Sequence, residues 1–504
     1  MRAVLAVLAC AASAPLGAQS RDASPTIVIE HVTVVDVERG VLLPDRRVVV
    51  AGTRIVGVDS SARGAVPGGA ARAIDGRGKF LIPGLWDMHV HAAWGSFGPG
   101  LPTIDSTYAP LFVANGVTGV RDMWGQAARV ARWKAHVRER TAPWPRIVSP
   151  LHILDGPNPV WIGSVSVTTA EDARRAVDSL ARAGADFIKA YSLLPRAAFL
   201  AAAAEAKRLG LPIAGHVPNA VGVAAASDAG MRSIEHLTLI PAACSGVADS
   251  VRAAYDALPD SVPPATTMRL AQMFAPAILA RPDSARCDAL ARRLAANGTW
   301  LVPTLTVLRS TSHLDDTTLA SDPRTRYAPS RYIRMWTPQP GTPSGAVTAE
   351  GWALRRRLFA RQLDIAGQMA RAGVPILAGT DFGNPFIYAG FSLHDELALL
   401  VRAGLTPAEA LRAATLGPAR YLDATDSLGT VAPGKLADLV LLDADPLADI
   451  RNTARIRVVI LNGRYLDRGA LDAMIARAER TVRESAAGPP MRRPPRPARR
   501  RARP

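Results

Sequence analysis

The chain has 504 residues, of which 48% are hydrophobic and 20% are charged, so it is long and apolar enough to bury a large core, which excludes an intrinsically disordered protein. Its formal net charge is +17, but seven arginines lie in residues 491–504 with no acidic residue among them, and without this tail the charge falls to about +10. Part of the excess charge therefore lies in a tail, the net charge says little about partners, and we expect no nucleic-acid partner.

The N-terminus has the pattern of a secretory signal peptide. Met1 and Arg2 precede an apolar run over residues 3–12, and small residues follow up to Ala18. We expect residues 1–18 to be the signal and the mature protein to be exported, either to the periplasm or to the medium. No later apolar run reaches the roughly 18 residues of a membrane-spanning helix, so we expect no transmembrane segment.

The C-terminal tail and the cysteines are compatible with export. Residues 488–504 alternate proline with arginine and offer no apolar face, which predicts a disordered tail. In an oxidising compartment Cys244 and Cys287 are free to form a disulfide, although two cysteines alone do not establish that they pair.

Two segments, one near each end of the chain, are typical of short β-strands. The first, residues 26–82, contains β-branched or alternating runs at residues 26–36, 47–50, 54–58 and 80–82. The second, residues 427–467, contains runs at residues 439–442 and 458–460, and then Asn462-Gly463, a strong two-residue hairpin signal. We expect one small β-sandwich built from both ends of the chain, with two unrelated β-lobes as the alternative.

The middle of the chain, residues 83–426, alternates strand-like runs with Ala-rich amphipathic segments. The runs lie at residues 117–121, 146–149, 187–191, 212–216, 233–236, 300–305 and 375–381. Strands that alternate with helices predict βαβ units and a parallel sheet. Together with a strand that ends at His91 they number eight, which predicts a closed, TIM-like (β/α)8 barrel.

The first of these strands carries two histidines. Residues 80–86 are apolar and lead into Asp87-Met88-His89-Val90-His91. Because the side chains of a strand alternate, Asp87, His89 and His91 lie on one face. Two imidazoles that point the same way are weak evidence of a metal site when they stand alone.

Four further polar residues lie in or at the end of other predicted strands. They are Lys189, His216, His236 and Asp381, and Lys189 interrupts an apolar run in which an unpaired charge would be costly to bury. In a (β/α)8 barrel the carboxyl ends of all strands converge on one mouth, so these residues and the histidine pair can meet there. Imidazoles and a carboxylate suit Zn²⁺ or a similar divalent ion.

These motifs resemble those of the amidohydrolase superfamily, in its imidazolonepropionase-like and prolidase-like branch. The resemblance covers residues 26 to 467. It rests on GLWDMHVH at 84–91, GVTGVRD at 116–122, IK at 188–189, GH at 215–216, SIEH at 233–236, GTD at 379–381 and PGKLAD at 433–438.

The resemblance implies a binuclear site with two divalent ions, expected to be zinc, and a hydroxide that bridges them. The implied ligands are His89, His91 and Asp381 for a buried ion, His216 and His236 for a more exposed ion, and a carboxylated Lys189 that bridges both. Asp381 would also be the catalytic residue that takes a proton from the water and passes it to the leaving group.

Amine chemistry agrees with this role for Lys189. A lysine amine can lose its proton and become a carbamate, whereas arginine cannot. The chain has five lysines and 55 arginines, so a lysine at this position is informative. The alternative is an ammonium group at the edge of the core that pairs with an acid.

An insertion is expected between His236 and Asp381. These residues are 145 positions apart with one predicted strand between them, which places the insertion at about residues 241–350. Both Cys244 and Cys287 fall within it. Loops inserted at the mouth of a barrel usually form the substrate pocket, so this segment is expected to set specificity.

Four residues are weaker candidates for substrate binding. Tyr191 has the same parity as Lys189 and could donate a hydrogen bond to a substrate oxyanion, and Arg121 could meet a substrate carboxylate. The alternatives are a plain strand-end tyrosine and a structural ion pair. His152 and His394 could line the pocket, or be structural histidines. Asp87 is expected to support a ligand rather than to be one.

Three functions compete at this stage. We favour a binuclear hydrolase of an amide or peptide-like carbon–nitrogen bond in a small molecule, for instance in an Xaa-Pro dipeptide. The second is a mononuclear deaminase, or an imidazolone- or lactone-type hydrolase, on the same barrel. Such sites usually carry an acid shortly after the histidine of the fifth strand, but VPNA follows His216 here. The third is a catalytically silent binding protein of the envelope. The sequence leaves a homo-oligomer open.

Overall fold

A computed structural model describes residues 26–61, 72–94 and 104–486. The expected signal peptide, residues 1–18, and the expected tail, residues 488–504, lie outside these ranges. Within them, every helix is too short or too polar to cross a membrane.

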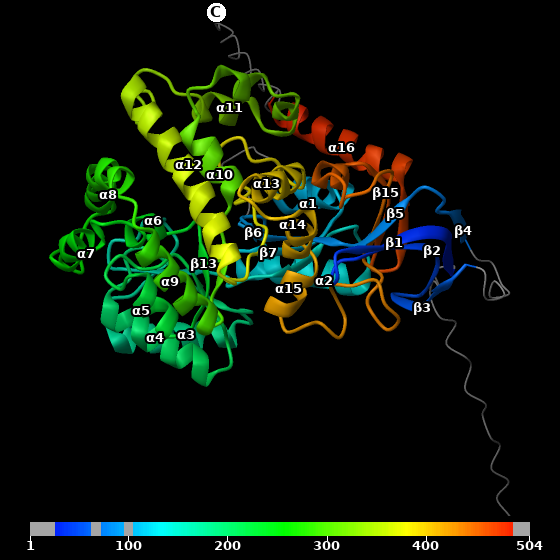
Figure 1. Cartoon of the computed structure of the whole chain (residues 1–504), viewed down its shortest axis with the longest axis horizontal. Helices are drawn as coiled ribbons and strands as arrows, with labels where there is room; N and C mark the ends of the chain where they lie inside the picture. The colour runs from blue at the N-terminus through cyan, green and yellow to red at the C-terminus, as the bar shows by residue number, and fades with distance from the viewer. Residues whose placement is uncertain (1–25, 62–71, 95–103, 487–504) are drawn as a thin grey trace, which may run out of the picture.

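Strands from both ends of the chain form one sheet of eight, in the order β17-β16-β15-β5-β1-β2-β3, with β4 paired to β1 (Figure 1). They are β1 (Ile27–Asp36), β2 (Val41–Ala51), β3 (Arg54–Ser60), β4 (Arg72–Asp75), β5 (Phe80–Pro83), β15 (Leu439–Leu442), β16 (Ile456–Leu461) and β17 (Arg464–Asp467). The antiparallel pairing of β15 with β5 joins the two ends of the chain. The expected domain built from both ends is therefore confirmed, and its strands are continuous in a single sheet.

The predicted hairpin in this sheet is confirmed. β16 and β17 pair antiparallel, and Leu461 lies opposite Arg464. The two turn residues, Asn462 and Gly463, have φ of 50° and 74°. Both values are positive, as a tight two-residue turn that matches the twist of the strands requires, and asparagine and glycine tolerate them best.

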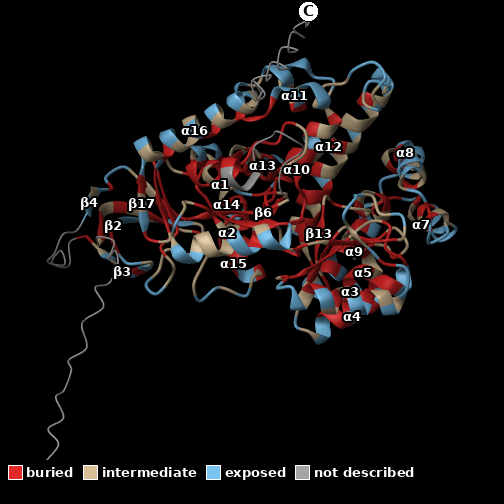
Figure 2. Cartoon of the chain, turned by 180° about the vertical axis from the view of Figure 1, so that it is seen from behind, coloured by how far each residue is buried: buried red, intermediate tan, exposed pale blue. Residues whose placement is uncertain are grey.

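Parallel strands and helices form the second, larger domain. Its strands form two sheets, β6-β7-β8 and β10-β9-β11-β12-β13-β14. They are β6 (Leu85–Val90), β7 (Val117–Asp122), β8 (Arg146–Val148), β9 (Ile153–Asp155), β10 (Val165–Ser166), β11 (Ile188–Ala190), β12 (Ile213–Gly215), β13 (Met231–Glu235) and β14 (Trp300–Val302). Buried residues concentrate in these strands, and the outer faces of α3 and α4 are exposed (Figure 2).

Helices alternate with the strands, as the sequence predicts. Those before β14 are α1 (Ile104–Ala114), α2 (Ala127–Glu139), α3 (Ala170–Arg182), α4 (Arg196–Arg208), α5 (Val223–Asp228), α6 (Ile240–Ala243), α7 (Ala248–Asp256), α8 (Pro264–Ala280) and α9 (Ser284–Ala296). Those after it are α10 (Leu305–Ser312), η1 (Thr317–Ser321), η2 (Pro323–Tyr327), α11 (Ser330–Trp336), α12 (Ala349–Arg371), α13 (Phe391–Arg402), α14 (Pro407–Ala413), α15 (Leu416–Tyr421), η3 (Ile450–Ala454) and α16 (Arg468–Ala486).

Residues 375–382 occupy the place of the eighth strand, between β14 and β6, without forming a regular ladder. The amide of Leu377 donates to β14 at 2.8 Å. On the other side, the carbonyl of Ala378 and the amide of Asp381 bond to β6 at 2.9 and 2.7 Å. Asp381 has φ of 62°, outside the β region, which ends the strand where its side chain enters the site.

The third strand of the barrel is divided. β8 pairs with β7, whereas β9 pairs with β11. Between the two pieces the chain turns at Pro150 and at Leu151, whose φ is 64°, and proline cannot donate to a ladder. The fold is thus TIM-barrel-like, with a break in the ladder at this strand.

The expected insertion contains α7 and α8, which project from the barrel on the left of Figure 1, and the short helices η1, η2 and α11. A disulfide between Cys244 and Cys287 ties the end of α6 to α9 across 43 residues of sequence. The open question of whether these two cysteines pair is therefore answered by the fold.

Removal of this disulfide is expected to lower stability. In the variant with Cys244→Ala and Cys287→Ala, the unfolded chain regains the freedom that the cross-link removes, which costs roughly 2–4 kcal/mol. Thermal unfolding should show a lower Tm for the variant. A reductant should lower the Tm of the unmodified protein and leave that of the variant unchanged, and equal Tm values for the two oxidised proteins would contradict the prediction.

Candidate active site

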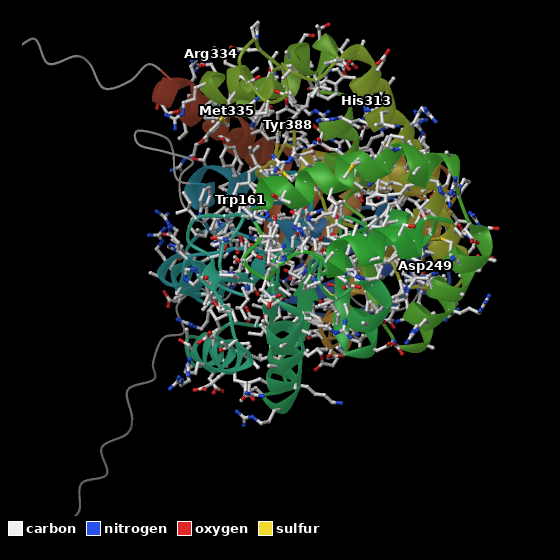
Figure 3. The ribbon with its side chains drawn as sticks, turned by 90° about the vertical axis from the view of Figure 1, so that its left-hand side faces the viewer. Trp161, Asp249, His313, Arg334, Met335 and Tyr388 are labelled. Carbon is white, nitrogen blue, oxygen red and sulfur yellow. A yellow bond between two sulfur atoms is a disulfide. The ribbon has the colours of Figure 1, made fainter. Side chains whose placement is uncertain are left out.

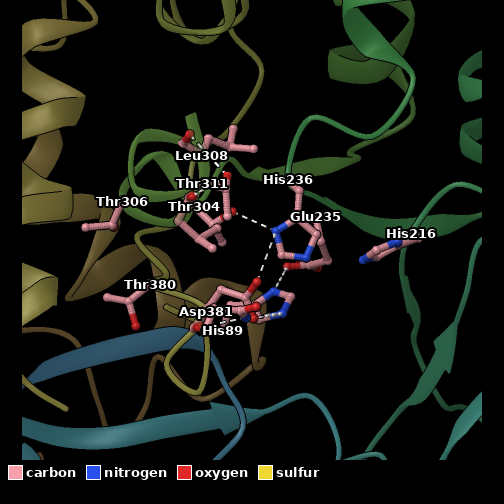
Figure 4. Close-up of polar contacts among 12 residues, drawn as sticks. His89, His216, Glu235, His236, Thr304, Thr306, Leu308, Thr311, Thr380 and Asp381 are labelled. Atoms are coloured by element: carbon pink, nitrogen blue, oxygen red, sulfur yellow. Dashed lines mark hydrogen bonds and ion pairs between the residues drawn. The ribbon is translucent and has the colours of Figure 1, made fainter. Parts of the chain in front are cut away.

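All six predicted metal-site residues lie at the carboxyl ends of the barrel strands. His89 is in β6 and His91 follows it, Lys189 is in β11, and His216, His236 and Asp381 follow β12, β13 and residues 375–380. The imidazoles form a row, with centroid separations of 5.6 Å (His91 to His89), 4.5 Å (His89 to His236) and 4.8 Å (His236 to His216). Figure 4 shows His89 and His236 beside Asp381, with His216 farther to the right.

A group of three residues is the tightest part of this row. One ligand atom each of His89, His236 and Asp381 lies within 4.8 Å of the others. Oδ1 of Asp381 is 3.4 Å from Nε2 of His89 and 3.1 Å from Nε2 of His91. Nε2 of His89 and Oδ1 of Asp381 are buried and have no hydrogen-bond partner. Buried polar atoms rarely lack a partner, and a cation bound between these two atoms would be a partner for both.

Hydrogen bonds to Nδ1 orient three of the histidines. Nδ1 of His89 bonds to Glu235 Oε2 at 2.7 Å, that of His216 to Ser192 Oγ at 2.9 Å, and that of His236 to Thr304 Oγ1 at 2.7 Å. The Thr304 hydroxyl donates to the carbonyl of Pro303, so it accepts from His236. Because Nδ1 is engaged in each ring, Nε2 is the atom left to bind a metal.

Electrostatics keep these predicted ligands in the protonation states that bind metals. Burial lowers the pKa of His89 and of His216, and lowers that of His236 to about 4, so all three imidazoles are neutral at pH 7. Burial alone would raise the pKa of Asp381, but His236, His91 and Lys189 outweigh it and lower this pKa. The site therefore presents neutral nitrogens and an ionised carboxylate.

Lys189 is almost fully buried, with 1% of its surface exposed. Among the described residues, no carboxylate lies within 4.0 Å of its Nζ, so it does not form the ion pair of the alternative interpretation. Burial lowers the pKa of Lys189 to about 8, although Glu235 and Asp381 act in the opposite direction. The amine is thus readily deprotonated, as carbamate formation requires.

Arg121 does not face the substrate, so the prediction that it binds a substrate carboxylate is wrong. It is fully buried, and its guanidinium donates to both oxygens of Glu235 at 2.8 and 2.9 Å. Its other donors bond to Met88, Ser233 and Tyr421. With every nitrogen engaged, Arg121 forms the structural ion pair that was the alternative.

Glu235 is the residue that sequence reasoning missed. It has no exposed surface, and it joins Arg121 to the ring of His89. The sequence did contain a signal for it. In a strand that ends at Glu235, the side chains of Ser233 and Glu235 point the same way. An acid on the inner face of a barrel strand needs a buried cation as its partner.

Asp87 supports its neighbours, as expected. Its carboxylate accepts from the amide and hydroxyl of Thr380 at 3.0 and 2.6 Å, and from the amide of His89 at 3.2 Å. It therefore ties the segment that ends at Asp381 to β6. Burial raises the pKa of Asp87 to about 7.

His394 is a structural histidine, and the prediction that it lines the pocket is wrong. Its Nδ1 bonds to Thr453 Oγ1 at 2.9 Å and its Nε2 to the carbonyl of Asn115 at 3.1 Å, so both nitrogens are used in packing α13 against η3 and α1. The side chain of His152 is half-buried and its Nδ1 has no hydrogen-bond partner, and a role in the pocket stays a prediction.

Tyr191 lies at the site. Its ring stacks on that of His216 with centroids 3.9 Å apart, and its hydroxyl accepts from Trp161 Nε1 at 2.7 Å. The hydroxyl proton of Tyr191 is therefore left to donate elsewhere, and its role toward a substrate oxyanion stays a prediction.

Similarity to known proteins extends along most of the chain. The model of the amidohydrolase family matches residues 80–466. The imidazolonepropionase of Pyrobaculum arsenaticum is 46% identical over 76 residues, which make up 15% of this chain and 19% of that protein. The curated relatives that the chain matches are thus covered over about a fifth of their length or less.

Solved structures match over nearly the whole fold. The bottromycin amidohydrolase superposes with a TM-score of 0.65 at 27% identity, over 91% of this chain and 90% of that one. A Xaa-Pro dipeptidase with methionine bound in its active site superposes with a TM-score of 0.61 at 20% identity, over 88% of this chain and 100% of that one. These matches confirm the TIM-barrel-like fold with a sheet domain from both ends.

The variant Glu235→Gln is expected to weaken metal binding 10- to 100-fold, because a neutral amide holds the His89 ring less firmly than a carboxylate does. Titration of the metal-free protein against a chromophoric chelator measures this affinity.

The matched control for Glu235→Gln is Asp438→Asn. This substitution also removes a buried carboxylate that pairs with an arginine, Arg146, at 2.6 Å. It should cost stability and leave metal affinity unchanged. Equal metal affinity in Glu235→Gln and in the unmodified protein would contradict the role of Glu235.

His394 should make the fold sensitive to acid. Burial lowers its pKa to about 4 from 6.5, so the unfolded chain takes up a proton between these values that the folded chain does not. The contribution of neutral His394 is therefore complete above pH 6.5 and is lost as pH falls through 4, at a cost of roughly 3 kcal/mol. Chemical unfolding at several pH values measures the free energy of unfolding. Between pH 4 and 6.5 this free energy should change less steeply with pH in His394→Gln than in the unmodified protein, and identical slopes would contradict this.

Proposed function

The chain belongs to the amidohydrolase family, and from that premise we propose that it is a metal-dependent hydrolase that cleaves a carbon–nitrogen bond in a small amide or peptide-like substrate, such as an Xaa-Pro dipeptide. The proposal is carried by one observation: His89 Nε2 and Asp381 Oδ1 are buried 3.4 Å apart, and neither atom has a hydrogen-bond partner. The fold shared with a Xaa-Pro dipeptidase and with an amidohydrolase supports the choice of bond.

The donor set suits two divalent ions, with zinc the first choice. Zinc usually takes four ligands in a tetrahedral arrangement. The site offers six side-chain donors, which are His89, His91, Lys189, His216, His236 and Asp381. Six donors exceed the need of one ion. Carboxylation of Lys189 would turn its buried amine, for which the described residues offer no ion pair, into an anion with two oxygens, which fits a position between two cations.

The chain's own residues account for the proton transfers. When bound, the two ions would supply an activated water and polarise the scissile carbonyl. Asp381 is ionised, so it can accept the proton of the water on its carboxylate and deliver it to the leaving nitrogen. Bonds from Thr380 to Asp87 hold the adjacent Asp381 in place, and the free proton of the Tyr191 hydroxyl is available to a developing oxyanion.

A mononuclear hydrolase of the imidazolone type is the second candidate, favoured by the match to an imidazolonepropionase. Lys189 argues against it, because its buried amine has no role around a single ion held by histidines and Asp381. We also propose that the protein is exported. The disulfide between Cys244 and Cys287 supports this, since such bonds persist in oxidising compartments.

Removal of the Lys189 amine is expected to abolish one ion site. Metal analysis should find two ions per chain in the unmodified protein and fewer in Lys189→Ala, with hydrolysis of the best substrate reduced at least 100-fold. Asp381→Asn should lose activity to a similar extent. Screening dipeptides, N-acyl amino acids and lactones against the zinc-loaded enzyme identifies that substrate.

The outcomes separate the candidates. One ion per chain and full activity in Lys189→Ala would support the mononuclear enzyme. Full occupancy by two ions without turnover of any amide, ester or lactone would indicate a binding protein. Undiminished hydrolysis in both Lys189→Ala and Asp381→Asn would overturn the proposed function.

A further inference from the structure

A row of aromatic side chains leads from the metal ligand His216 to the protein surface. Tyr191 stacks on His216 with centroids 3.9 Å apart and accepts a 2.7 Å hydrogen bond from Trp161. Beyond it, Trp161 lies 6.3 Å from Trp124, and Trp124 stacks on Trp94 at 4.7 Å. We call Tyr191, Trp161, Trp124 and Trp94 the aromatic row.

The aromatic row belongs to the mouth of the barrel. Trp94 and Trp124 follow the carboxyl ends of β6 and β7, Trp161 follows β9, and Tyr191 follows β11. Loops at these ends carry the substrate contacts of barrels of this kind. The row is therefore continuous with the metal site and lies on the side where a substrate must enter.

One member of the row, Trp161, is exposed, and its loop is held in position. Trp161 has 47% of its surface exposed, and its neighbour Ile162 has 97%. The buried carboxylate of Asp155 accepts from the amide of Val160 at 2.9 Å and from that of Leu193 at 2.8 Å, so it links the loop of Trp161 to the turn after Tyr191. Figure 3 shows Trp161 from the left-hand side of Figure 1.

This geometry suits an aromatic ligand. The indole N–H of Trp161 is satisfied by Tyr191, so its exposed surface offers apolar contact and a π face rather than a hydrogen bond. Another aromatic ring that stacks on an exposed indole buries apolar surface. The stacking itself adds binding free energy beyond that of the buried area.

We propose that the aromatic row is a substrate subsite that binds an aromatic side chain next to the scissile amide, so that the substrates are dipeptides or N-acyl amino acids with an aromatic group. The inference rests on the proposed function, because it takes the metal site as the place of bond cleavage. Trp161 is the specificity-determining residue, and Tyr191 connects it to the reacting centre.

The test compares Trp161→Ala with the unmodified zinc-loaded protein on two pairs of dipeptides, Phe-Pro with Ala-Pro and Pro-Phe with Pro-Ala. The unmodified protein should show a KM at least 10-fold lower for the aromatic member of one pair. In Trp161→Ala this difference should fall to within 3-fold. Trp161→Phe should restore part of it, because a ring is retained.

Two further measurements keep the alternatives apart. Met273→Ala on α8 removes another side chain that is 68% exposed and should change neither KM. Binding of N-acetyl-phenylalaninamide and N-acetyl-alaninamide by calorimetry tests the subsite without turnover. Preference for the aromatic amide, lost in Trp161→Ala, would support the subsite even if no peptide is cleaved and the proposed function fails.

Cleavage with equal KM for aromatic and alanine peptides, and no preference in binding, would overturn the subsite and leave the proposed function standing. A change from dimer to monomer in Trp161→Ala, with KM unchanged, would also overturn it, because the exposed indole would then be covered by a second copy of the chain. Gel filtration with light scattering measures that change.

Discussion

The site depends on a carboxylate that is buried between a guanidinium and an imidazole. Glu235 receives two hydrogen bonds from Arg121 and one from His89, and none of the three side chains has exposed surface. An unpaired carboxylate in this position would cost several kcal/mol, so Arg121 is a condition for Glu235 to be there. The ion pair in turn fixes which nitrogen of His89 faces the site.

The same constraint connects strands that are distant in the chain. Arg121 is in β7, Glu235 in β13 and His89 in β6, so the bonds cross the inside of the barrel. Further bonds from Arg121 to Ser233 and to Tyr421 extend the network to α15. The same contacts therefore close the barrel and orient His89, because displacement of any of these strands would leave a buried charge without its partner.

Function is divided between this rigid interior and the surrounding loops. The donors sit at the strand ends, and strain is accepted there, since His236 and Asp381 both have positive φ. We infer that substrate selectivity depends on the loops, which carry Trp161 and Tyr191. Substitutions in these loops can leave the ion pairs inside the barrel in place. This division explains how a hydrolase of this family can keep one donor set and accept different substrates.

Much of the fold followed from local patterns. Alternation and β-branching located the strands of both domains, and Asn462-Gly463 located a hairpin, because strand and turn preferences act over a few residues. The donors at 89, 91, 189, 216, 236 and 381 were recognisable because polar residues in apolar strands need a reason to be buried. The sequence also located the segment 375–381 as a strand. It did not predict the irregular backbone of this segment, which depends on contacts with β14 and β6.

The sequence by itself determined which residues stand at the strand ends, and with them the family and the donor types, since these depend on residue identity and spacing along one strand. Only the tertiary structure decided the partners of those residues. Arg121 and His394 were both expected at the substrate, but Arg121 meets an acid 114 positions away and His394 a carbonyl 279 positions away. Such pairings depend on how distant strands and helices pack, which no local pattern encodes.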